Sequence, residues 1–159
     1  MTSGEPSAWG RRLRIGFVCS AGGHLTQAAI LARRFPDARR FLISYRDDVD
    51  MEGVSAYAIP TFFYKPWRTP WCLLKILRIL FKERPDALIS TGSEPAALAF
   101  PLAKILFGCK LIYVESCAQV RRPSGMGRLL YRLCDLFLVQ SPALLAHYPK
   151  ARYAGAILA

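Results

Sequence analysis

The chain has 159 residues, enough for one domain with a buried core and few for a two-domain enzyme. Hydrophobic residues make up 53% and charged residues 21%, which excludes wholesale disorder and indicates apolar surface that meets a membrane or another protein. The formal net charge of +11 favours an anionic partner, such as anionic lipid or a phosphorylated substrate. We do not expect nucleic acid, because the basic residues are interleaved with Trp, Leu and Ile and the sequence has no nucleic-acid-binding signature.

Apolar runs of strand length alternate with helical patterns along the whole chain. After a polar tail at residues 1–12, we expect a single domain over residues 13–159. Strands are predicted at 13–20, 40–45, 55–59, 86–90, 110–114, 136–140 and 152–154, and helices at 24–35, 70–83, 95–107 and 124–133. This alternation predicts an α/β fold, a parallel sheet with helices on both faces. The sequence has neither a signal peptide nor the roughly 18 consecutive uncharged residues that span a bilayer. The five cysteines form no CxxC pair and are interpreted as reduced core residues of a cytosolic protein.

The loop after the first strand is the first candidate site, because ligands of parallel sheets bind beyond the carboxyl ends of the strands. Ser20, Gly22 and Gly23 lead into a helix, where backbone N–H groups and the helix dipole can hold an anion. A Gly-Gly turn alone is more often purely structural. His24 at the helix start could act as a base or hold a hydroxyl, and the alternative is that it caps the helix.

The segment from residue 62 to residue 84 has the most unusual composition. Aromatic residues precede a helix on which three cations recur at spacings of three and four. This arrangement is typical of an interfacial element, with aromatic rings at headgroup depth and cations toward lipid phosphate. The alternative is a crossover helix that packs on the sheet. The predicted membrane contacts are Phe62, Phe63, Trp67, Trp71, Lys75, Arg78 and Lys82.

Two further loops are predicted at the same edge of the sheet. Thr91, Gly92 and Ser93 form a second helix opening, in which Ser93 is expected either to cap the helix or to bind phosphate. Glu115 follows the fifth strand and could bind sugar hydroxyls or act as a base; the alternative is an ion pair with the arginines that follow it. The remaining candidates for acceptor or phosphate binding are Ser116, Arg121 and Arg122.

Several motifs in order give the chain a resemblance to a known family. They are SAGGH at 20–24, ISTGSEPAALAFPLAKILFGCKLIYVES at 89–116, RRPSGMGRLLYRLCDLFLVQ at 121–140 and YPKARYAGAIL at 148–158. The chain resembles the acceptor-side subunit of the two-part UDP-N-acetylglucosamine transferase of the dolichol pathway. It looks closer still to bacterial PssD and CpsF type proteins of exopolysaccharide and capsule assembly, and it is distantly similar to the N-terminal domain of MurG. The resemblance covers about residues 14–158.

The resemblance implies one half of a GT-B glycosyltransferase, with a Rossmann-like fold. A separate donor-binding subunit would hold the UDP-sugar, and this chain would bind the lipid-diphosphate acceptor. Gly22, Gly23 and His24 match the family's glycine loop, and Thr91–Ser93 and Glu115–Ser116 match two other family loops. The eukaryotic subunit has an N-terminal membrane helix, whereas residues 1–12 are polar here, so the resemblance leaves anchoring to residues 62–82.

The sequence-based hypothesis is therefore a peripheral subunit on the cytoplasmic face of a bacterial inner membrane. With its partner, it would extend an undecaprenyl-diphosphate-linked saccharide with inversion, and His24 or a nearby carboxylate would deprotonate the acceptor hydroxyl. No cofactor or metal is expected, because no cluster of His, Cys and carboxylates has ligand spacing. Two alternatives stay open: a non-catalytic membrane adaptor for the donor subunit, and a stand-alone nucleotide-binding or regulatory domain.

Overall fold

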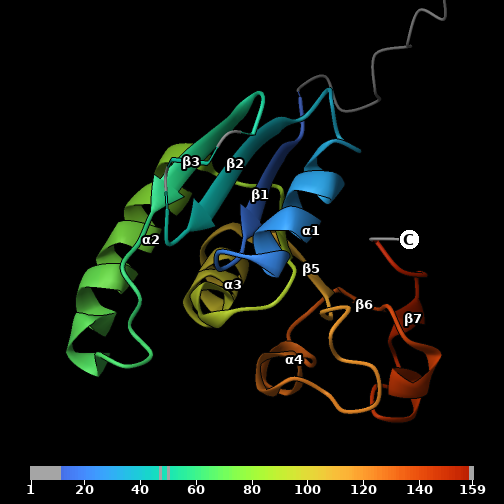
Figure 1. The fold of residues 1–159 in the computed structure, drawn as a ribbon. Coiled ribbons are helices and arrows are strands. Elements are labelled where there is room, and N and C mark those ends of the chain that lie inside the picture. The colour runs from blue at the N-terminus through green and yellow to red at the C-terminus, as the bar shows by residue number, and fades with distance from the viewer. Residues whose placement is uncertain (1–11, 47, 50, 158–159) are drawn as a thin grey trace, which may run out of the picture.

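The computed structural model describes residues 12–46, 48–49 and 51–157, and its core is one seven-stranded sheet (Figure 1). The strand order is β3-β2-β1-β4-β5-β6-β7, and all neighbouring strands are parallel. Each strand lies within the predicted range or one residue from it. The strands are β1 (Arg14–Val18), β2 (Arg39–Ser44), β3 (Val54–Ala58), β4 (Ala87–Ser90), β5 (Lys110–Val114), β6 (Leu136–Val139) and β7 (Arg152–Tyr153). The predicted polar tail lies outside the described residues apart from Arg12.

Helices cover both faces of the sheet, as predicted. Side chains of α2 (Thr69–Glu83), α3 (Glu94–Phe107) and α4 (Gly125–Leu130) join one buried cluster, together with Phe41 of β2. Side chains of α1 (Gly23–Ala32) join a second cluster with Phe17 of β1. Short 3₁₀ helices occupy Pro66–Arg68 and Pro142–Ala146. The fold is therefore a Rossmann-like α/β fold.

The helix boundaries follow local signals in the sequence. Pro70 stands in the first turn of α2, where its missing N–H costs nothing, and Arg84 ends the helix in a left-handed conformation at φ 45°. Helix α4 begins where the Ser124 hydroxyl accepts the Gly127 N–H at 2.8 Å. It ends three residues earlier than predicted, and the residues that follow form turns in which the Leu133 N–H donates to the Leu130 carbonyl oxygen at 2.9 Å.

Candidate functional site

The carboxyl ends of β1, β4 and β5 lie side by side, because these strands are neighbours in the sheet. The loops that follow them hold the predicted site residues from Ser20 to His24, from Thr91 to Ser93 and from Glu115 to Arg122. Hydrogen bonds join the first loop to the second, and within the third segment the Ser124 N–H donates to the Glu115 carboxylate. The strand order places all three loops at one edge of the sheet, so the sequence-based expectation of a shared edge is confirmed.

His24 is fixed by a reciprocal pair of hydrogen bonds with Thr91. Its ring Nδ1 lies 2.7 Å from the Thr91 carbonyl oxygen, and the Thr91 hydroxyl donates to the His24 carbonyl oxygen at 2.8 Å. Because a carbonyl oxygen only accepts, Nδ1 carries the proton, and the neutral ring keeps its lone pair on Nε2. Nε2 has no hydrogen-bond partner among the described residues, and the side chain is partly exposed. This is the geometry of a positioned proton acceptor.

His24 does not cap α1, so that alternative is wrong. The residue that precedes the helix is Gly22, and no side chain bonds to the free N–H groups of the first turn. Gly22 is exposed at φ 79°, and a Cβ at Gly22 or Gly23 would meet nothing within 4 Å. A ligand can therefore approach the backbone of this turn without obstruction. Ser20, which is half-buried and lies two residues after the end of β1, borders the turn.

Thr91 and Gly92 lie beneath the His24 ring. Thr91 is 1% exposed, and Gly92 is buried at φ 102°. A Cβ on Gly92 would lie 3.0 Å from Cε1 of His24 and 3.3 Å from the Tyr113 hydroxyl. These contacts hold the His24 ring in place. The sequence-based prediction that Thr91 and Gly92 bind the acceptor or its phosphate stays a prediction.

Ser93 does not make the predicted capping bond. It takes a φ of 139°, its side chain accepts no N–H of α3, and its hydroxyl oxygen is buried without a hydrogen-bond partner among the described residues. A non-glycine residue in this conformation is strained by about 1–3 kcal/mol. The strain falls on the segment that holds His24, which is where functional sites concentrate such conformations.

Glu94 is a functional candidate that the sequence analysis did not select. One oxygen of its carboxylate accepts the backbone N–H groups of Phe62 and Phe63, both at 2.5 Å. The other accepts the hydroxyl groups of Tyr45 at 2.6 Å and Thr61 at 3.3 Å. Glu94 thus fastens the aromatic loop before α2 to the segment that orients His24. Its place at a helix start beside three predicted site residues was the available signal.

Glu115 is fully buried and holds the loop that follows it. Its carboxylate accepts the Ser116 N–H at 3.2 Å, the Ser124 N–H at 3.3 Å and the Tyr148 hydroxyl at 2.9 Å. Burial and the nearby Glu115 carboxylate raise the pKa of Tyr148, which keeps that phenol a donor. Gly127 makes room for this cluster, because a Cβ there would meet the carboxylate oxygen at 2.2 Å.

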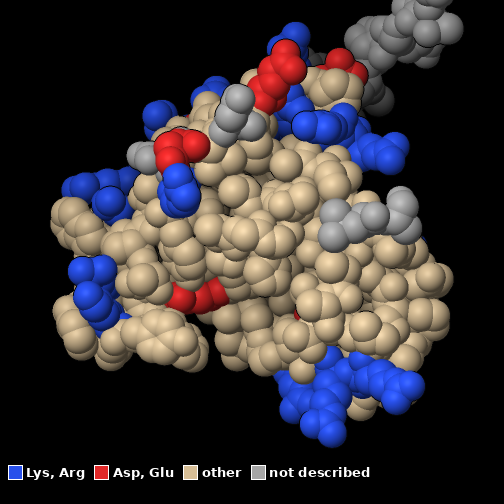
Figure 2. Space-filling view, viewed as in Figure 1, with Lys and Arg blue, Asp and Glu red and all other residues tan. Residues whose placement is uncertain are grey.

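The ion pair predicted as the alternative for Glu115 is wrong. In the described part of the chain, neither Arg121 nor Arg122 pairs with it; both are exposed. Figure 2 shows basic side chains gathered at the lower edge, where the loop before α4 and α4 itself lie in Figure 1. Ser116 is 9% exposed, and its hydroxyl accepts the Ala118 N–H at 3.3 Å.

The aromatic segment combines features of both predicted alternatives. Helix α2 packs on the sheet through buried residues such as Ile76 and Leu80, as a crossover helix does. The segment before α2 and the first turn of α2 nevertheless expose large rings: Phe63 is 70%, Trp67 71% and Trp71 53% exposed. Phe62 is half-buried and Lys75 partly buried, whereas Arg78 and Lys82 are exposed.

The described residues include neither a membrane-spanning helix nor a metal-ligand cluster. Within 12–46, 48–49 and 51–157, no helix is long and apolar enough to cross a bilayer. In the same ranges, no group of three or more His, Cys, Asp or Glu residues could hold a metal ion.

Comparison with known proteins places the chain in a family. A family model described as "Oligosaccharide biosynthesis protein Alg14 like" matches residues 55–157. The chain belongs to the Alg14-like family. A UDP-N-acetylglucosamine transferase subunit of Yarrowia lipolytica is 36% identical over 87 residues, which cover 52% of this chain and 40% of that protein. The human subunit of the same name is 24% identical over 184 aligned positions, which cover 92% of this chain and 83% of the human one.

Solved structures support the fold. MurG of Acinetobacter baumannii superposes with a TM-score of 0.64 at 16% identity, over 82% of this chain and 42% of MurG. A UDP-N-acetylglucosamine 2-epimerase of Rickettsia bellii superposes with a TM-score of 0.69 at 11% identity, over 93% of this chain and 46% of the epimerase. This Alg14-like chain thus superposes on less than half of each enzyme. That share agrees with the prediction that the chain has the fold of one half of a GT-B protein.

Proposed function

We propose that this Alg14-like chain is the acceptor-side subunit of an inverting GT-B glycosyltransferase. A separate donor-binding subunit would hold the UDP-sugar, and the acceptor would be an undecaprenyl-diphosphate-linked saccharide of bacterial exopolysaccharide or capsule assembly. Membership of a family whose relatives are named transferase subunits supports the reaction class. The observation that carries a role for this subunit is the orientation of His24, which leaves Nε2 free at the open edge of the sheet.

In the proposed reaction, Nε2 of His24 takes the proton of the acceptor hydroxyl. The hydroxyl oxygen forms the new bond to the anomeric carbon, and the bond from that carbon to the UDP oxygen breaks with its electron pair on the diphosphate. The attack comes from the face opposite the leaving group, so the anomeric configuration inverts. Proton transfer to a positioned base contributes about 10²–10⁴-fold to such a rate.

The other residues of the edge have supporting parts in this proposal. The open turn at Gly22 and Gly23 and the exposed Arg121 and Arg122 would neutralise the acceptor diphosphate. Glu115, first expected as a second base, would act as a positioning residue, because its buried carboxylate fixes the loop that leads to these arginines.

The exposed aromatic residues before α2 and in its first turn would place this edge at a membrane. Phe63, Trp67 and Trp71 would sit at headgroup depth, and the cations of α2 would face lipid phosphate. A peripheral position on the cytoplasmic face of the inner membrane would bring the acceptor diphosphate within reach of His24.

Reconstitution with the donor-binding partner tests the proposal. The assay follows sugar transfer from a UDP-sugar to a lipid-diphosphate acceptor in vesicles, with this chain alone, the partner alone and both together. We expect transfer only with both. Transfer by the partner alone at the full rate would overturn the proposal. Transfer by the pair that survives substitution of both His24 and Glu115 would show a non-catalytic adaptor, and a monomer that binds NAD and no partner would favour a nucleotide-binding or regulatory domain.

A further inference from the structure

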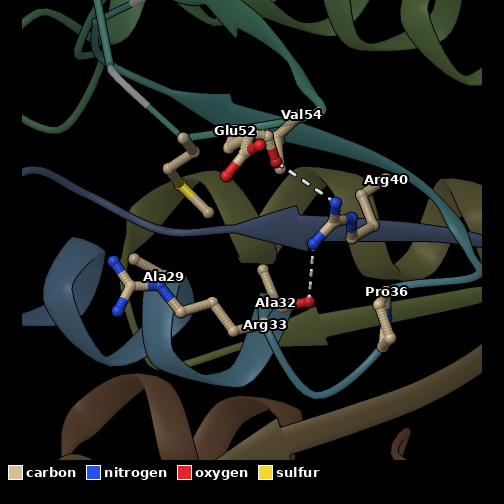
Figure 3. Close-up of a pocket in the computed structure, with 9 residues that line it drawn as sticks. Ala29, Ala32, Arg33, Pro36, Arg40, Glu52 and Val54 are labelled. Atoms are coloured by element: carbon tan, nitrogen blue, oxygen red, sulfur yellow. Dashed lines mark hydrogen bonds between the residues drawn. The ribbon is translucent and has the colours of Figure 1, made fainter.

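The opposite edge of the sheet, where the strands begin, carries a hollow lined by arginines. Arg12, Arg14, Arg39 and Arg40 line a cavity of about 520 Å³ at the starts of β1, β2 and β3. A neighbouring cavity of about 510 Å³ shares Arg40 and adds Arg33 of the turn after α1 (Figure 3). Each cavity is large enough for a phosphate group and its water. We call the first cavity the arginine hollow.

Main-chain carbonyl groups, rather than carboxylates, hold the central guanidinium groups of this hollow. Arg40 donates to the carbonyl oxygens of Ala32 at 3.0 Å and Glu52 at 3.2 Å, as the dashed lines of Figure 3 show. Arg14 donates to the Glu83 carbonyl oxygen at 3.4 Å. A carbonyl dipole orients a guanidinium group without cancelling its charge. The Nε atom of Arg40 is moreover buried, and no described residue forms a hydrogen bond with it.

The acidic groups near the hollow are fewer than its arginines. Glu83 pairs with Arg39 at 3.1 Å, and Asp86 accepts the backbone N–H of Arg14 at 2.9 Å. No acidic residue is among those that line the arginine hollow, and the neighbouring cavity adds Glu52. The described residues therefore leave a net positive charge focused in a concave site, where guanidinium groups bind phosphate oxygens in pairs.

Gly53 is fitted to this arrangement. It takes a φ of 69°, and a Cβ there would lie 2.8 Å from Nη2 of Arg40. Glycine therefore lets the turn before β3 approach the guanidinium group closely enough for the Glu52 carbonyl oxygen to bond it.

From these observations, we propose that the arginine hollow is a phosphate-binding site, separate from the His24 edge. Its ligand is a phosphate group carried either by an anionic phospholipid or by a soluble phosphate compound. The hollow adjoins the end of α2, because Glu83 is the last residue of that helix and pairs with Arg39. The cationic surface continues there, with Lys82 over the Tyr57 ring at 5.1 Å.

The position of the arginine hollow at the end of α2 is compatible with a phosphate group that belongs to a lipid headgroup. Helix α2 has 15 residues and so a length of about 22 Å, with the exposed tryptophans at its start and the hollow at its end. Two contacts at that separation would fix how the molecule is oriented on a bilayer, which one aromatic loop cannot do. The binding site itself does not depend on the transferase proposal.

The test compares two variants that each remove two positive charges. Arg12→Gln/Arg14→Gln changes the hollow, and the control Arg132→Gln/Arg152→Gln changes exposed residues elsewhere. The probes are inorganic phosphate, titrated by calorimetry, and vesicles of phosphatidylcholine with and without phosphatidylglycerol, measured by co-sedimentation. We expect the hollow variant to weaken phosphate-dependent binding about tenfold and the control to change it less than about twofold.

The two arms distinguish the source of the phosphate. Saturable binding of inorganic phosphate that the hollow variant loses indicates a soluble ligand, and a loss confined to phosphatidylglycerol vesicles indicates a lipid headgroup. The proposal is overturned if both double variants lose the same binding affinity. It is also overturned if the wild type binds no inorganic phosphate and binds vesicles equally well with and without phosphatidylglycerol. The exposed Arg12→Gln single variant repeats the test if the double variant does not fold, with about a threefold loss expected.

Discussion

Gly92→Ala tests the packing of His24 against the loop after β4. Alanine at φ 102° is strained by about 1–3 kcal/mol, and its methyl group would press on Cε1 of His24 at 3.0 Å and on the Tyr113 hydroxyl at 3.3 Å. Together these effects should lower the free energy of unfolding by about 3 kcal/mol. For a chain of this size, that corresponds to a fall in Tm of roughly 6–12 °C, measured by calorimetry. Sugar transfer should fall as well, because the methyl group displaces the ring.

Gly108→Ala provides the matched control. Gly108 also has a positive φ, 60°, but its Cβ would meet nothing within 4 Å. The control should lose only about 1 kcal/mol, or roughly 2–4 °C in Tm, and should keep its transfer activity. If Gly92→Ala were no less stable than Gly108→Ala and just as active, the reasoning about His24 would be refuted.

Three other predictions concern the supporting contacts. Glu94→Gln should lower the free energy of unfolding by about 1–3 kcal/mol, because a glutamine amide cannot accept from four donors, and it should weaken binding to vesicles through the loosened aromatic loop. Asp135→Asn should cost about 1 kcal/mol at pH 7, measured by urea unfolding, through the lost contacts to Lys104 and the Leu111 N–H. Burial raises the pKa of the Cys19 thiol to about 12, so at pH 8 an alkylating reagent should modify it only as fast as the chain opens.

The sign of the Asp135 effect follows from its pKa. Burial is the largest single influence and acts to raise this pKa, but the hydrogen bonds from Lys104 and the Leu111 N–H, together with the charges of Lys104 and Lys110, outweigh it, and the folded pKa lies below 3.8. The stabilisation is therefore present above the unfolded pKa and is lost as the pH falls through the folded pKa. If the free energies of unfolding of Asp135→Asn and the wild type differed equally at pH 2 and pH 7, the prediction for Asp135 would be wrong. Fast alkylation of Cys19 in the native chain would contradict the prediction for that thiol, and an unchanged free energy of unfolding of Glu94→Gln would contradict the prediction for Glu94.

The centre of the sheet was predictable because β1, β2 and β4 are largely buried. Such strands are apolar runs bounded by Gly, Pro and charged residues, and these signals are local. The carboxyl-edge rule then places the loops of His24, Thr91 and Glu115 at the same edge without any knowledge of their contacts.

The direction of side chains within the site was not predictable. Glu94 and Glu115 both follow strands in the sequence, yet Glu115 points into a cluster with Tyr148, 33 residues away, and Glu94 reaches Phe62, 32 residues away. Pairings at that separation depend on how loops pack on one another, which no periodicity encodes. The contact that Thr91 makes was not predictable for the same reason: its hydroxyl bonds the backbone of His24, 67 residues away.

Whether His24 acts as a base is tested most directly by the transfer rate of His24→Asn in the reconstituted complex. Asparagine keeps an N–H donor at the position of Nδ1 for the Thr91 carbonyl oxygen but has no basic nitrogen. With assembly confirmed by gel filtration, we expect a single-turnover rate lower by at least about 100-fold. A rate within about threefold of the wild type would contradict it and would place the base on the partner subunit.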